Sequence, residues 1–172
     1  MYLDPYDAAK EPHSARAEEG RIVETPEPSS WTFGQRLLAD WFTAHALDGM
    51  VPSDAPIDAL GPVIGSVHKL VREPETDDFR YLIYGRTIAR KANMGRDGMR
   101  VSELIEPTGS VMLEHYRTLA ARPLLFVGRL TYVGLDIQNS EWVRAVTPLG
   151  RPETGVSHFI VFTDTVQDAR PA

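Results

Sequence analysis

The sequence predicts an α+β protein with one antiparallel sheet and helices packed on it. Apolar residues recur at helical spacing in two segments, 31–47 and 110–122. Five other short segments are rich in β-branched and aromatic residues, as strands are. The order is one helix, two strands, a helical insert and three strands. Because strands joined by short connections pair as antiparallel neighbours, one sheet is expected.

Composition excludes several classes of protein. Of the 172 residues, 42% are hydrophobic and 24% charged, which is typical of a globular chain. No apolar run of about 18 residues occurs, and the N-terminus lacks the basic and apolar regions of a secretory signal. The absence of cysteine excludes disulfides, thiolate metal sites, cysteine nucleophiles and a cysteine–flavin adduct. We therefore expect a soluble, cytoplasmic protein with no membrane partner.

The acidic charge is concentrated at the N-terminus. The net charge of the chain is −6, and residues 1–30 contribute −4 of it, with seven acids and three bases. This stretch contains four prolines and few large apolar side chains, so it buries too little surface to offset the entropy of ordering. We expect a disordered arm at 1–28, a domain at 29–166 and a tail at 167–172. The arm either contacts a partner or, as is more common, is only solvated.

The first helix is amphipathic. Ser29 and Ser30 are suited to capping its start, and Gly49 and Pro52 end it after roughly four turns. Its apolar face is expected either to contact a second copy of the chain in a homodimer or to dock on the sheet. The residues of this face are Leu37, Leu38, Trp41 and Phe42.

The remaining elements follow in order. Segments 68–73 and 79–85 predict a hairpin, because a connection with proline and aspartate separates them. Residues 86–104 predict two short helices around a turn at Gly95 and Gly98. The helix that follows, within 110–122, ends at Pro123, and its apolar face is formed by Val111, Met112, His115, Tyr116 and Leu119. The three final strands are expected within 123–134, 140–150 and 156–165.

Four motifs carry a resemblance to a known family. They are LLADWFTAHALDGMVPSDAPID (37–58), DDFRYLIYG (77–85), GRDGMRVSEL (95–104) and VTPLG (146–150). Together they resemble a bacterial PAS-like family in which a Trp-bearing N-terminal helix precedes the sensor core. The resemblance covers residues 30–165. Leu82 departs from it, since the family usually has arginine there.

The resemblance implies a fold and a class of function. The fold is a five-stranded antiparallel sheet of order 2-1-5-4-3, with short helices on one face and an N-terminal helix that packs on another subunit. Such domains often enclose a small molecule between sheet and helices, and they act as sensors or docking modules. The expected partners are a small-molecule ligand, a signalling protein that carries the output, and a second copy of the chain.

Polar groups on otherwise apolar faces are the candidates for ligand contact, because a few polar groups usually orient a ligand in an apolar site. Each could equally lie at a dimer contact or a sheet edge. The candidates are Tyr81, His115, Tyr116, Arg129, Trp142, Arg144 and His158.

No cofactor or metal is identified. The five histidines include no H-x-x-x-H pair and no cysteine assists them, so no metal site is expected. His115 is the one reasonable haem ligand, and flavin bound without a cysteine adduct stays open. No phosphate-binding or nucleophile motif occurs, and no catalytic residue is expected.

Residues 86–100 carry five bases and one acid in an acidic chain. They could bind an anionic partner, a nucleotide second messenger or the acidic arm, although a solvated surface is the more common reason for such a run. Nucleic-acid binding is not expected, because the whole chain is acidic and has no helix-turn-helix signature.

The sequence thus favours a non-enzymatic sensory or adaptor domain over two alternatives. One is an NTF2-like isomerase or cyclase, in which His158 with Asp164 or His115 with Glu114 would act as acid–base pair. The other is an interaction module whose own side chains fill the core. The helical insert between the second and third strands favours the PAS-like arrangement over the NTF2-like one.

Overall fold

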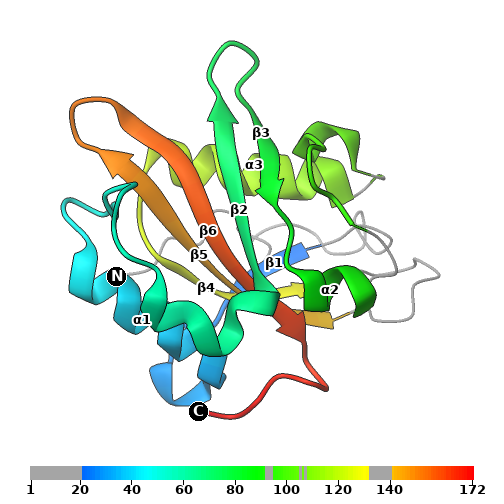
Figure 1. Cartoon of the computed structure of the whole chain (residues 1–172). Coiled ribbons are helices and arrows are strands. Elements are labelled where there is room, and N and C mark those ends of the chain that lie inside the picture. The colour runs from blue at the N-terminus through cyan, green and yellow to red at the C-terminus, as the bar shows by residue number, and fades with distance from the viewer. Residues whose placement is uncertain (1–20, 92–94, 105, 107, 132–140) are drawn as a thin grey trace.

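The computed structural model describes residues 21–91, 95–104, 106, 108–131 and 141–172. It is an α+β fold in which one antiparallel sheet has helices on both faces (Figure 1). The strands are β1 (Arg21–Glu24), β2 (Val67–Glu73), β3 (Asp78–Ile83), β4 (Phe126–Thr131), β5 (Glu141–Arg151) and β6 (Gly155–Thr165). In the described ranges, no helix is long and apolar enough to cross a membrane.

The sheet has six strands in the order β1-β4-β5-β6-β2-β3, so the expected count of five is wrong. The additional strand, β1, comes from the segment expected to be a disordered arm and pairs with β4. Its Ile22 is fully buried. Ile22 and Val23 are adjacent apolar residues in an acidic stretch, and the composition of that stretch did not indicate a strand. Without β1, the neighbours run β3-β2-β6-β5-β4, as the PAS resemblance implies. Residues 1–20 of the expected arm lie outside the described residues.

Helix α1 (Phe33–His45) covers one face of the sheet, beside the 3-10 segment η3 (Asp58–Ser66). The residue that caps its start is Thr32 and not the expected Ser29 or Ser30. The side chains of Thr32 and Gln35 form a capping box. Leu38 and Trp41 are buried against the chain's own sheet, with Leu37 and Phe42 partly buried beside them. Leu38 and Trp41 therefore dock on the chain's own sheet, and the expected dimer contact of this face stays a prediction.

The C-terminal segment folds back on the start of α1. The amide of Phe33 donates to the carbonyl of Arg170 at 2.7 Å, and the Arg170 guanidinium lies 4.0 Å from the Phe33 ring centroid. The expected tail is thus part of the folded domain.

The other face is covered by α2 (Arg86–Lys91), the short 3-10 turn η4 (Val101–Glu103) and α3 (Thr108–Ala121). The two short helices expected in 86–104 correspond to α2 and η4. The apolar face expected for α3 is confirmed, since all five of its members are buried: Val111, Met112, His115, Tyr116 and Leu119.

Two neighbouring residues fix α1 on the sheet. The side chain of Gln35 donates from Nε2 to the carbonyls of Gly128 (2.8 Å) and Arg144 (3.1 Å), and so joins α1 to β4 and β5. Gly34 brings the helix so close to β6 that a Cβ there would lie 2.1 Å from the Phe162 ring.

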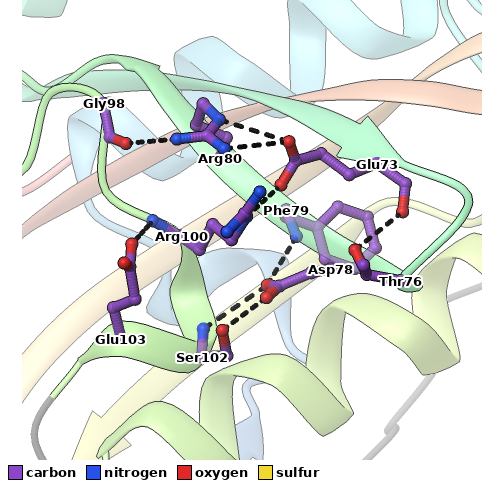
Figure 2. Close-up of polar contacts among 9 residues, drawn as sticks. All are labelled: Glu73, Thr76, Asp78, Phe79, Arg80, Gly98, Arg100, Ser102 and Glu103. Atoms are coloured by element: carbon purple, nitrogen blue, oxygen red, sulfur yellow. Dashed lines mark hydrogen bonds and ion pairs between the residues drawn. The ribbon is translucent and has the colours of Figure 1, made fainter.

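A polar network holds the β2–β3 hairpin to the segment before α3 (Figure 2). The carboxylate of Glu73 accepts from Arg80 at 3.0 Å and from Arg100 at 2.6 Å. The buried Asp78 accepts hydrogen bonds from the Phe79 amide and the Ser102 hydroxyl. The hydrogen bond from Arg100 holds the pKa of Glu73 below its usual value.

The close approach at Gly34 generates a stability prediction. Although alanine is the better helix former, Gly34→Ala should lower the free energy of unfolding by about 1–3 kcal/mol, because its methyl group overpacks Phe162. The matched control is Gly61→Ala, which meets no atom within 4 Å and should change stability by less than about 0.5 kcal/mol. Urea unfolding of both variants measures this. Equal effects would show that α1 can shift to accept the methyl group.

Candidate ligand-binding site

Five buried polar side chains gather between the sheet and α3. They are His68 from β2, Tyr81 from β3, His115 and Tyr116 from α3, and Arg144 from β5, and each is at most 3% exposed. We call this set the polar cluster. Its walls are apolar, since the rings of Phe79, Phe126 and Phe159 pack against the histidine and tyrosine of α3.

Strand alternation places Arg144 in this cluster. Trp142 and Val146, two residues away on either side, belong to the core beneath α3, whereas Val143 and Ala145 pack beneath α1. The cross-strand neighbours of Arg144 are Gly128 and Thr163, neither of which can neutralise a cation. Its Cζ lies 5.1 Å from the ring centroid of Tyr116.

The guanidinium of Arg144 is a buried charge that has no counter-ion among the residues that the structure describes. Its Nε and Nη2 have no hydrogen-bond partner among the described protein groups, and no carboxylate in those ranges forms an ion pair with it. Arginine stays protonated in proteins, so it cannot avoid the penalty of burial by losing its charge. An unpaired buried charge is strongly unfavourable. The cluster therefore suits a group that brings negative charge.

His68 presents a second donor. Its Nδ1 accepts the Gly85 amide at 2.9 Å, which assigns the proton of the neutral ring to Nε2. The ring stacks on Tyr84, with centroids 4.1 Å apart, and Nε2 has no partner in the part of the chain that the structure describes. Burial lowers the pKa of His68 well below its ordinary value, and the charges of Arg144 and Arg96 lower it further.

His115 and Tyr116 complete the cluster from the side of α3. Neither ring nitrogen of His115 has a hydrogen-bond partner within the described ranges. The hydroxyl of Tyr116 is close to Arg144 and Tyr81 of the same cluster. Burial, with a contribution from Arg144, lowers the pKa of His115 well below its ordinary value. Burial raises the pKa of Tyr116, while the nearby Arg144 opposes the rise. Both side chains are thus neutral near pH 7, and Arg144 carries the charge.

Two expected site residues lie elsewhere. Arg129 is exposed and follows the strand alternation of Val127, on the side of α1. His158 alternates with Phe159, so it also faces away from α3, and its Nδ1 lies 2.9 Å from the Ser157 hydroxyl. They do not belong to the polar cluster, because the alternation of each strand turns them to the opposite face of the sheet. Their contact with a ligand stays a prediction.

The other five expected residues share the α3 face: Tyr81, His115, Tyr116, Trp142 and Arg144. Sequence reasoning missed His68. The sequence did contain a signal for it. His68 is two residues from the apolar Leu70 on a predicted strand, and residues two apart on a strand share one face of the sheet.

The basic segment makes contacts within the chain. Lys91 pairs with Asp164 at 2.6 Å and Asp168 at 3.1 Å, and Arg100 pairs with Glu73. The guanidinium of Arg96 lies 5.3 Å from the ring centroid of Tyr84. Three of its five bases thus take part in the fold.

The acid–base pairs of the enzymatic alternative are not brought together. His158 and Asp164 are six residues apart on one strand, about 20 Å, and Asp164 binds Lys91. Glu114 is exposed on the outer side of α3, whereas His115 is buried on the inner side. Among the described side chains, no three histidines or carboxylates gather as metal ligands.

Comparisons with known proteins do not identify a family for this chain. No family model and no curated protein matches the chain. A solved structure described as an RNA-binding light-oxygen-voltage receptor is similar over 88% of this chain and 40% of that one, with 14% sequence identity and a TM-score of 0.47. The chain thus spans less than half the length of that neighbour, and the likeness adds nothing to the topology described above.

The buried charge predicts an unusual stability effect. In protein freed of bound compounds by unfolding and refolding, Arg144→Met should raise the free energy of unfolding by about 1–4 kcal/mol, because an apolar side chain of similar length avoids desolvating a charge. Arg129→Met, at the exposed arginine of β4, is the control and should change it by less than about 0.5 kcal/mol. Urea unfolding measures both. A loss of several kcal/mol in Arg144→Met would mean that the charge is paired within the protein.

The two neutral histidines predict a pH dependence. Below pH of about 6.5 the unfolded chain protonates His68 and His115, but the folded chain does not, since burial lowers both pKa values. The free energy of unfolding should therefore fall by about 1.4 kcal/mol for each histidine and each pH unit below 6.5. Denaturant unfolding at pH 7.5, 6.5 and 5.5 measures the slope. His115→Phe should reduce it, whereas Tyr116→Phe on the same helix should not.

Proposed function

We propose that the protein is a cytoplasmic sensory or adaptor domain that binds a small molecule between its sheet and α3, with its output in a partner protein. The single observation that carries this is the polar cluster, in which Arg144 Nε and Nη2, His68 Nε2 and both ring nitrogens of His115 have no partner among the described residues although they lie in an apolar core. Few polar groups inside apolar walls are typical of small-molecule sites. The PAS resemblance of the sequence implies a ligand in the same place.

The contacts of α3 supply a mechanism for signalling. A ligand that joins Arg144 of the sheet to His115 or Tyr116 would favour one packing of α3 over another, which is a population shift. On its outer side, Arg117 of α3 donates to the carbonyl of Asp77 at 2.8 Å. Asp78 in turn accepts from Ser102, so a change at α3 reaches the β2–β3 hairpin (Figure 2).

A partner protein and a second copy of the chain belong to this proposal. Because Leu38 and Trp41 are buried within the chain, a homodimer would use other surfaces. Two exposed apolar side chains, Leu82 and Ile83, lie on β3, which is an edge strand of the sheet.

Mass spectrometry of the freshly purified full chain tests the proposal. A native mass that exceeds the denatured mass should reveal a bound compound, which Arg144→Met should lose and Arg129→Met should keep. Removal of the compound should speed amide hydrogen exchange in α3 more than in α1, because only α3 contributes to the polar cluster.

A bare native mass, together with α3 exchange that a small-molecule extract of the source cells leaves unchanged, would contradict ligand binding. The interaction module with a filled core would then be the better description.

A further inference from the structure

The polar cluster also indicates the chemistry of its ligand. We infer that the ligand is a small organic acid whose single carboxylate pairs with Arg144 and whose remaining body is apolar. This inference rests on the proposed function, since it concerns the same site. It follows from the count of charges, the geometry of the unpartnered atoms and the composition of the walls.

The charges favour a monoanion. Arg144 contributes the one positive charge of the polar cluster, since Arg96, whose charge also reaches His68, is partly exposed and lies over the Tyr84 ring. His68 accepts a backbone amide on Nδ1, which a doubly protonated ring could not do. Asp78 is buried too, but it is bonded to Ser102 and Phe79 on the outer side of the hairpin. A single carboxylate would neutralise Arg144, whereas a phosphate dianion would leave one buried negative charge without compensation.

The unpartnered atoms favour a carboxylate among monoanions. Nε and Nη2 of Arg144 form one edge of the planar guanidinium, and their two N–H groups point in nearly the same direction. This edge matches the two oxygens of a carboxylate, which can accept both hydrogen bonds in parallel. Chloride would supply the charge but only one accepting atom.

The remaining groups describe the body of the ligand. His68 Nε2, which has no partner among the described residues, is an additional donor to oxygen. The rest of the surroundings are apolar side chains, among them aromatic rings, with the Tyr116 ring centroid 5.4 Å from that of Phe79 and 5.1 Å from that of Phe159. Hydroxylated or further charged bodies would lose their hydration there without compensation.

The test uses the full chain, freed of bound compounds by unfolding and refolding, and matched pairs of acid and amide. The pairs are acetate with acetamide, butyrate with butyramide, and benzoate with benzamide; inorganic phosphate and chloride are added separately. At least one acid should raise the thermal midpoint while its amide does not. In parallel, the compound released by denaturing fresh protein is identified by its mass and should contain one carboxylate.

Three variants assign the effect to Arg144. Arg144→Lys keeps the charge but loses the paired N–H edge, and should weaken binding of the acid about tenfold or more. Arg144→Met should abolish it, and Arg129→Met should leave it unchanged. If Arg144→Met does not fold, Arg144→Lys with the amide comparison decides the question.

The outcomes separate the two proposals. A released compound that lacks a carboxylate, equal stabilisation by phosphate or chloride, or equal binding of acid and amide would overturn the acid while leaving small-molecule binding intact. No released compound, together with no stabilisation by any probe, would overturn both.

Discussion

The permanent charge of Arg144, buried at the centre of the sheet, is the constraint on which the rest of this structure depends. A guanidinium cannot give up its proton, so its surroundings must accommodate the charge. The histidines nearby are neutral, and the tyrosine hydroxyls cannot neutralise it. Within the described residues, the fold positions this charge but does not pair it.

The backbone of the same residue is fixed from the opposite face. The carbonyl of Arg144 accepts from Gln35, which begins α1 as part of its capping box. Gly34 lets that helix lie directly against Phe162. The face beneath α1 is thus a closed apolar core.

The α3 face is built differently. Its helix meets the sheet through His115 and Tyr116, and meets the β2–β3 hairpin through Arg117 and the segment before it. Because the polar cluster lies within this contact, α3 is the helix whose packing a ligand bound there, as proposed, would change most directly. The fold thereby connects the polar cluster to the hairpin of the edge strand β3, through α3 and the hydrogen bond from Arg117 to the carbonyl of Asp77.

The sequence by itself determined the helices, the hairpin, the three final strands and the apolar face of α3, because these follow from local periodicity. It did not reveal β1, whose Ile22 pairs with Leu130 more than one hundred residues away. Nor did it separate Arg144 from Arg129, since both interrupt apolar strands. Alternation states which residues of one strand share a face. Only the pairing of strands and the packing of helices decide which face covers Arg144 and which exposes Arg129.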